Sequence, residues 1–149
     1  MARRWTWLVG ALVMVVMGGT ALAQSGVRVV ADLDPNSAAG IRIEGLAADS
    51  QGRLLTIDLD SARLFRITPS TGGVEVLGTL PRPGSGEAFD RAGNLYIASG
   101  DVIQRVLASS LAGSTLDPAT VQIFATGVPG ANGLAFDVAG NLYVSGVRC

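Results

Sequence analysis

Histidine and lysine are both missing from this sequence, and cysteine occurs only once, as the last residue, Cys149. Without histidine the chain cannot form a Ser-His-Asp triad, a Cys-His pair or a zinc site with imidazole ligands. A single cysteine excludes a disulfide within the chain. Arginines and acidic residues nearly balance, with a formal net charge of −1. We therefore expect no basic patch that would bind nucleic acid or an anionic membrane.

Long apolar runs are also missing, apart from one at the N-terminus. Paired arginines precede the apolar run 8–17, and residues 21–23 read Ala-Leu-Ala, which is the order of a secretory signal peptide. The run is too short to span a bilayer, which takes about 20 apolar residues. We expect residues 1–23 to be a signal peptide that is removed on export. Residues 24–149 would then be a secreted or periplasmic domain that is not bound to the membrane.

A short phrase recurs three times in the rest of the chain. Each copy contains Asp-x-x-Gly-x-Leu, and the copies differ in the residue five positions before the aspartate, which is Glu44, Ser85 or Asn132. We interpret the shared part as structural and the variable residue as a candidate functional site. In the shared part, the aspartate is expected to bond the local backbone and the glycine to adopt a positive φ, which makes the phrase a tight turn.

A second, strand-like phrase begins at Val27, Val74 and Val121, at intervals of 47 residues. A fixed period in the 40s with strand-like phrases is typical of a β-propeller. Within one period we expect strands at 45–48, 54–58, 64–67 and 74–77, and four short strands form one blade.

The second strand of each period is apolar on both faces, which predicts that neighbouring blades bury it from both sides. In the next period we expect the corresponding strands at 95–99 and 102–106. The segment 108–118 is rich in Ser, Ala and Gly and is predicted to be a surface loop. No helical periodicity is present in residues 24–149, so no substantial helix is expected there.

These patterns predict an all-β protein, a β-propeller of four-stranded antiparallel blades. The third period stops at Val147, before its third and fourth strands, and residues 27–33 resemble an outermost strand of another blade. The chain would contain two full blades and parts of two others. We expect it to be the N-terminal part of a longer propeller, because a blade buries its apolar faces against its neighbours.

Glu44, Ser85 and Asn132 occupy equivalent positions just before the first strand of their blades. Because first strands line the central channel of a propeller, these residues should meet at one mouth of it. Their carboxylate, hydroxyl and amide oxygens suit a hard cation such as Ca²⁺. Ser85, Arg82 and Glu87 are candidate substrate-binding residues, and Arg82 would hold an anionic substrate. Glu87, which would face the channel, is also the best spare carboxylate for the ion if Ser85 cannot serve. A structural role is the alternative for each of these residues.

Two phrases resemble motifs of a known family, the gluconolactonase, regucalcin and luciferin-regenerating enzyme family. They are Ile43-Glu-Gly-Leu-Ala-Ala-Asp49 and Pro129-Gly-Ala-Asn-Gly-Leu-Ala-Phe-Asp-Val-Ala-Gly-Asn-Leu-Tyr-Val144. The resemblance implies a six-bladed propeller with one divalent cation at the channel mouth and, in many members, lactone hydrolysis. It assigns metal binding to Glu44 and Asn132.

The chain departs from this family at the motif between those two ligands. There the family has Asn-Asp-Gly, whose asparagine holds substrate, whereas residues 85–87 read Ser-Gly-Glu. A further family aspartate, metal ligand and general base, would lie beyond Cys149, so no catalytic residue can be named. The expected function is an exported lactonase-like propeller that uses Ca²⁺ on a lactone or sugar-derived molecule and is inactive as the chain stands.

A non-catalytic function is the alternative. The period Gly-Leu-Ala-x-Asp-x-x-Gly-x-Leu-Tyr-Val also resembles NHL-type repeats, which build scaffolds and recognition surfaces for protein partners. Glu44 and Asn132 favour the lactonase-like interpretation, since they lie on nonadjacent blades at matching positions. Ser85 and the near-identity of the periods elsewhere favour the NHL-like one.

Overall fold

The computed structural model describes residues 11–14, 28–34 and 40–147. Most of the expected signal peptide, 1–23, lies outside the described residues. Its described part, Ala11–Met14, forms β1, which pairs antiparallel with β2 (Arg28–Asp32). The sequence placed this segment outside the fold, and its removal on export stays a prediction.

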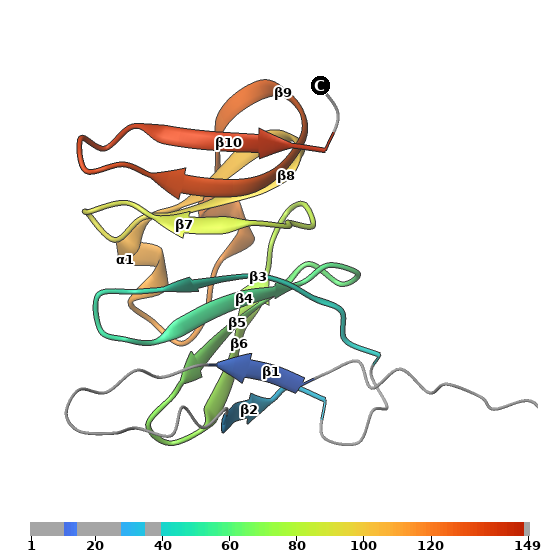
Figure 1. Ribbon diagram of the computed structural model, residues 1–149, viewed down its shortest axis with the longest axis vertical. Helices are drawn as coiled ribbons and strands as arrows, with labels where there is room; N and C mark the ends of the chain where they lie inside the picture. The colour runs from blue at the N-terminus through green and yellow to red at the C-terminus, as the bar shows by residue number, and fades with distance from the viewer. Residues whose placement is uncertain (1–10, 15–27, 35–39, 148–149) are drawn as a thin grey trace, which may run out of the picture.

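Four strands form the first complete blade. They are β3 (Ile43–Ala48), β4 (Leu54–Asp58), β5 (Arg63–Thr68) and β6 (Gly73–Thr79), paired antiparallel in chain order. All four overlap the strands expected from the sequence, and β4 matches its expected bounds. The prediction of four-stranded antiparallel blades is confirmed by this sheet (Figure 1).

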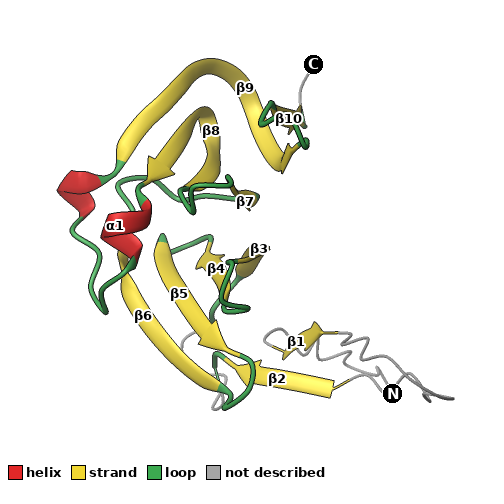
Figure 2. Ribbon diagram, turned by 90° about the vertical axis from the view of Figure 1, so that its left-hand side faces the viewer, coloured by secondary structure: helices red, strands yellow, loops and turns green. Residues whose placement is uncertain are grey.

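The second sheet has the order β10-β9-β8-β7. It contains β7 (Glu87–Phe89), the long strands β8 (Leu95–Val106) and β9 (Gln122–Phe136), and β10 (Leu142–Gly146). Figure 2 shows that β8 and β9 are strongly bent. The start of β8 pairs with β7, its end pairs with the start of β9, and the end of β9 pairs with β10.

This pairing joins the second blade to the first strands of a third. The sequence predicted two separate strands where the structure has β8, and the bend lies at Gly100, whose φ of 68° is readily adopted only by glycine. Two further glycines with positive φ, Gly127 and Gly130, lie where β9 changes direction between its two partners.

Three apolar clusters hold the sheets together. On one face of the first blade, Leu55, Ile57 and Leu64 pack against β8. On its other face, the neighbouring residues in β4 and β5 pack against β2. Every residue of β4 is therefore buried, as the two-sided apolar pattern predicted. A third cluster joins Tyr96 and Ile103 to the residues of β9 and β10.

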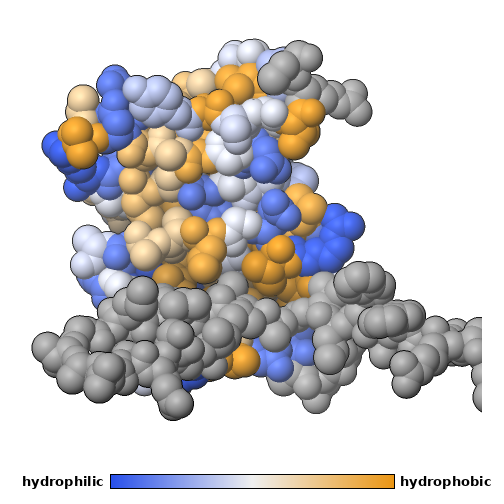
Figure 3. All heavy atoms as spheres, in the orientation of Figure 1, coloured by the Kyte–Doolittle hydropathy of each residue, from blue (hydrophilic) through white to orange (hydrophobic). Residues whose placement is uncertain are grey.

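The third blade is covered on one side only by described residues. Val138, Tyr143 and Val147, in and beside the edge strand β10, have 84%, 60% and 74% of their surface exposed. Figure 3 shows hydrophobic residues in orange on this upper part of the molecule. Apolar surface is thus open along β10 within the part of the chain that the structure describes.

The predicted surface loop at 108–118 is more than a loop. It contains the short helix α1 (Ala108–Leu111) and reaches the 3₁₀ turn η1 (Pro118–Thr120). Leu111 and Leu116 are buried in the cluster between the first two blades, and the Leu116 amide donates to the Leu77 carbonyl at 2.6 Å. Because the segment is rich in Ser and Gly, the sequence did not predict that these two leucines would be buried. Neither helical segment among the described residues is long enough to cross a membrane.

The repeated Asp-x-x-Gly phrase forms the predicted turn in all three copies. Asp90 Oδ1 accepts from the Asn94 amide at 2.9 Å and Oδ2 accepts from Asn94 Nδ2 at 2.8 Å. The Gly93 amide donates to the Asp90 carbonyl at 3.1 Å, with a φ of 81° at Gly93. Asp49 and Asp137 make equivalent bonds.

Replacing Gly93 by alanine is expected to lower the free energy of unfolding by about 1–2 kcal/mol, the cost of a left-handed backbone at an L-residue. The added Cβ would make only an ordinary contact, 3.5 Å from Ala108 Cβ, so the effect reports backbone strain. Urea unfolding measures it. Gly113→Ala is the control, because Gly113 has no positive φ and ample space, and equal losses in the two variants would contradict this account of the turn.

Candidate functional site

The structure brings the inner strands of the three blades together. β3, β7 and the last part of β9 run in the same direction in Figure 1. The Gly86 amide, just before β7, donates to the Asn132 carbonyl in β9 at 2.7 Å. On the other side of β7, the Ser85 carbonyl lies so close to Gly45 that a Cβ there would be 2.3 Å away. Glu44, Ser85 and Asn132 therefore belong to one continuous contact between strands, as their repeat positions predicted.

Two glycines make this close approach possible. A Cβ at Gly45 would lie 2.0 Å from Glu87 Oε2, and a Cβ at Gly86 would lie 2.2 Å from the Asn132 carbonyl oxygen. Real side chains do not approach so closely, so the absence of a Cβ at both positions is a requirement of the site. This close approach accounts for the glycines that directly follow Glu44 and Ser85 in the repeat.

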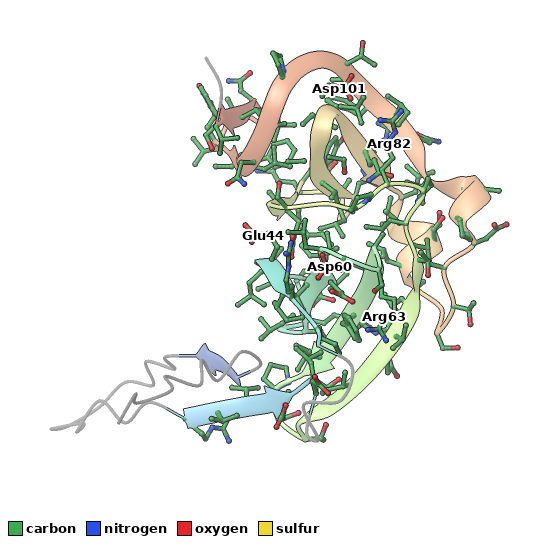
Figure 4. All side chains as sticks on the ribbon, turned by 90° about the vertical axis from the view of Figure 1, so that its right-hand side faces the viewer. Glu44, Asp60, Arg63, Arg82 and Asp101 are labelled. Carbon is green, nitrogen blue, oxygen red and sulfur yellow. The ribbon has the colours of Figure 1, made fainter. Side chains whose placement is uncertain are left out.

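Glu44 lies in β3 and is half-buried. The pairing of β3 with β4 is irregular between Glu44 and Ala47, and Thr56 Oγ1 donates to the Gly45 carbonyl at 2.7 Å across this irregularity. None of the described residues donates a hydrogen bond to the Glu44 carboxylate. Figure 4 shows this side chain projecting from the start of β3. Its oxygens are available to a ligand.

Ser85 has a structural role. Its hydroxyl lies 3.3–3.4 Å from three backbone carbonyls, those of Ala98, Ala131 and Asn132, and its amide donates to the Ala98 carbonyl at 2.8 Å. These contacts join the second blade to the third. The predicted role of Ser85 in holding substrate stays a prediction, but its hydroxyl proton is directed at the backbone.

Asn132 contributes through its backbone to the contact between β9 and β7. Its carbonyl accepts from the Gly86 amide, and the residue is half-buried. No hydrogen bond to its side-chain amide is made by the described residues. The amide oxygen of Asn132 is therefore a second side-chain oxygen without a hydrogen-bond partner among the described residues.

Glu87 differs from the prediction that it would face an open channel. Only 7% of its surface is exposed, and neither carboxylate oxygen has a hydrogen-bond partner among the described residues. The side chain lies against Gly45 of β3. Burial, together with the negative charge of Glu44, raises the pKa of Glu87 to about 9.

Asp58, in β4, is a buried carboxylate whose oxygens do have hydrogen-bond partners, and it can be compared with Glu87. It is 3% exposed, and its oxygens accept from the Arg42 and Asp60 amides, from Ser61 Oγ and from Arg63. Burial alone raises the pKa of this carboxyl, but the bonds from Ser61, Arg63 and the backbone outweigh it and hold the pKa below its usual value. Glu87 is equally buried and has none of these donors.

Arg82 lies apart from these groups. Its side chain is exposed and pairs with Asp101, Nη1 to Oδ1, at 3.5 Å, and Figure 4 shows the two together and away from Glu44. Its backbone carbonyl accepts from Gln104 Nε2 at 3.0 Å. The structure therefore does not bring the Arg82 guanidinium to Glu44, and its predicted role toward an anionic substrate lacks structural support.

A hollow of about 250 Å³ lies elsewhere, beside the Asp-x-x-Gly turns of the first two blades. Its lining includes Asp49, Arg53, Arg66 and Arg91 but none of the candidate site residues. Arg53 pairs with Asp49, and the buried Arg66 pairs with Glu75 outside the lining. Two of the three arginines that line the hollow, Arg53 and Arg66, are thus paired with carboxylates. The sequence did not indicate this hollow, because its three arginines come from separate segments of the chain.

The candidate site therefore holds two carboxylates and one amide oxygen, from Glu44, Glu87 and Asn132. Oxygen groups of this kind fit a hard divalent cation, whose remaining positions are taken by water. The described residues contain no cluster of three or more His, Cys, Asp or Glu side chains with metal-binding geometry. The class that the fold defines is a β-propeller, and side-chain oxygens without hydrogen-bond partners among the described residues lie on its inner strands.

Known structures share this fold. A gluconolactonase of Xanthomonas campestris matches with a TM-score of 0.59 and 22% identity over 82% of this chain and 38% of its own. A luciferin-regenerating enzyme matches with a TM-score of 0.55 and 19% identity over 82% and 41%. A regucalcin of Agrobacterium tumefaciens, described as a calcium-binding protein, matches with a TM-score of 0.57 and 18% identity over 85% and 43%.

These are the proteins of the family that the sequence motifs resemble, so the suspected resemblance is confirmed at the level of the fold. The chain spans about two fifths of the length of each of these structures. No protein-family model matches the sequence, and no curated protein matches it significantly.

Proposed function

We propose that this chain is part of a lactonase-like propeller that acts with a divalent cation, Ca²⁺, on a lactone or another sugar-derived small molecule. The observation that carries the proposal is the placement of Glu44 and Asn132. They lie on β3 and β9, on either side of β7, with side-chain oxygens that no described residue occupies. The fold shared with a gluconolactonase and with a calcium-binding regucalcin supports the same proposal.

Glu44 would supply the negative charge that holds the ion, and Asn132 a neutral oxygen. When bound, a divalent cation polarises a carbonyl and lowers the pKa of a coordinated water, which is the chemistry that lactone hydrolysis requires. Gly45 and Gly86 keep β3, β7 and β9 close enough for ligands from separate blades to share one ion. The general base is not among these residues, and the resemblance expects it on a later blade.

Substituting Glu44 by glutamine is expected to abolish any calcium-dependent lactone hydrolysis in the protein that contains this segment, because it removes the charge but keeps the shape. For the 149-residue chain alone we expect little turnover, since water would fill most of the coordination positions of the ion. A pH-indicator assay with a δ-lactone, with and without Ca²⁺, measures both. Asp101→Asn is the control, because it removes an exposed carboxylate that pairs only with Arg82.

A calcium-independent hydrolysis that is indifferent to Glu44→Gln would contradict this assignment.

The second candidate function, a non-catalytic NHL-like scaffold for a protein partner, is favoured by one observation. The Ser85 hydroxyl is directed at backbone carbonyls, as in a purely structural repeat. A scaffold would neither bind Ca²⁺ at this site nor hydrolyse lactones.

We also propose that the protein is exported and that residues 1–23 are removed. The expected result is a mature N-terminus at Gln24, because the small residues at 21 and 23 define the cleavage site. N-terminal sequencing of the protein recovered outside the cytoplasm measures this. Soluble exported protein that still begins at Met1 would contradict it.

A further inference from the structure

We infer that Glu87 of β7 would be a third ligand of the divalent cation, beside the Glu44 carboxylate of β3 and the Asn132 amide oxygen of β9. This inference rests on the cation proposed above and adds a residue that the family motif does not assign. In that motif a glycine stands where this chain has Glu87. The carboxylate must therefore be argued from its own surroundings.

The first argument is the unusual environment of this side chain. Glu87 is only 7% exposed, and both of its oxygens lack a partner among the described residues. Burying a carboxylate without hydrogen bonds is costly, because nothing replaces the water that it loses. Asp58, buried to a similar degree, receives bonds from two backbone amides, a hydroxyl and a guanidinium. A divalent cation would satisfy Glu87 and Glu44 together.

The second argument comes from the repeat itself. The positions equivalent to Glu87, three residues before the aspartate of each turn, are Leu46 and Leu134. The architecture of a blade therefore accepts a leucine at this position and does not call for a carboxylate. In the second blade alone, an acid replaces the leucine, and it lies beside the blade that carries Glu44.

The third argument is the shape of the space around the carboxylate. A Cβ at Gly45 would be 2.0 Å from Glu87 Oε2 and 2.7 Å from its Cδ. In the next contact along, Gly86 meets only the backbone of Asn132 and Gly133. The absence of a side chain at Gly45 thus leaves room for the Glu87 carboxylate, which lies against the residue that directly follows Glu44.

The inference is tested by calorimetric titration of the full chain with Ca²⁺ at about pH 7.5. We expect one site with a dissociation constant of about 10⁻⁴–10⁻³ M, in the range of weak extracellular calcium modules. Glu87→Gln and Glu87→Leu should each weaken binding at least tenfold, and Glu44→Gln should do the same. Asp101→Asn, on an exposed carboxylate paired only with Arg82, should change the constant less than twofold.

Glu87→Leu guards against misfolding, because it introduces the residue that the other two repeats carry. Without Ca²⁺ it is expected to melt at or above the temperature of the unsubstituted chain. At one fixed Ca²⁺ concentration, the melting temperature of the unsubstituted chain should rise clearly more than that of Glu87→Leu. This readout does not depend on enzymatic activity.

Two results would overturn the inference, and they are distinguishable. If Glu44→Gln loses Ca²⁺ while both Glu87 variants bind it as tightly as the unsubstituted chain, the proposed cation site stands and Glu87 is a buried neutral acid only. If the unsubstituted chain binds no Ca²⁺ and shows no thermal shift, the inference and the proposed cation site both fail in this chain.

Discussion

Substituting Gly45 by alanine is expected to lower the free energy of unfolding by roughly 2–5 kcal/mol. Two costs add. The φ of 73° at Gly45 strains an L-residue by about 1–2 kcal/mol. The new Cβ would also lie 2.3 Å from the Ser85 carbonyl oxygen and 2.0 Å from Glu87 Oε2, and such overpacking costs about 1–3 kcal/mol.

Urea unfolding of Gly45→Ala beside Gly40→Ala separates the two costs. Gly40 has a similar φ of 59°, but a Cβ there would meet nothing within 4 Å. Gly40→Ala should therefore show the strain alone. If the two variants lose the same stability, β3 and β7 are not in the close contact described here, and the shared site of Glu44 and Glu87 loses its basis.

Substituting Glu87 by glutamine, in the absence of divalent cations, is expected to stabilise the protein increasingly as pH rises from about 5 to 9. The pKa of Glu87 is raised from 4.5 to about 9 in the folded state. Between these values the unfolded chain releases the proton and the folded chain keeps it, so stability falls as pH rises. A pKa difference of one between the two states corresponds to about 1.4 kcal/mol, which makes the gain near pH 8 a few kcal/mol.

Thermal melts of the two proteins from about pH 4 to pH 9 measure this gain. Asp58→Asn is a control of opposite sign, because the bonded carboxylate of Asp58 has a lowered pKa. Asp58→Asn should destabilise the protein at neutral pH, and its deficit should shrink as pH falls below about 4. A pH-independent difference between Glu87→Gln and the unsubstituted chain would show that this carboxyl is solvated in the folded protein.

The repeats predicted most of this fold because the strands and turns of each period are determined by residues within that period. The strand at 54–58 has apolar residues on both faces, Leu54, Leu55 and Ile57, and is buried on both faces. The turn aspartates, such as Asp90, bond the backbone a few residues away, so their role depends on sequence neighbours alone. Shared offsets also predicted that Glu44, Ser85 and Asn132 would meet.

Features that depend on contacts between blades could not be predicted in the same way. Glu87 alternates with Phe89 along β7, and only the position of Gly45 on the adjacent strand shows that this face of β7 is closed. Leu111 and Leu116 are single apolar residues in a polar segment, and their burial depends on the gap beside Leu77. Arg82 pairs with Asp101, a residue of β8, and not with a candidate site residue.

The most direct test of the cation site is a crystal structure of the protein grown with Ca²⁺ or with Mn²⁺ as an anomalous scatterer. The account predicts one anomalous peak beside the start of β7, with oxygens of Glu44, Glu87 and Asn132 at about 2.3–2.6 Å from Ca²⁺ and waters completing the shell. A peak bound elsewhere, or a Glu87 carboxyl that stays buried against Gly45 with no ion beside it at saturating metal, would contradict it.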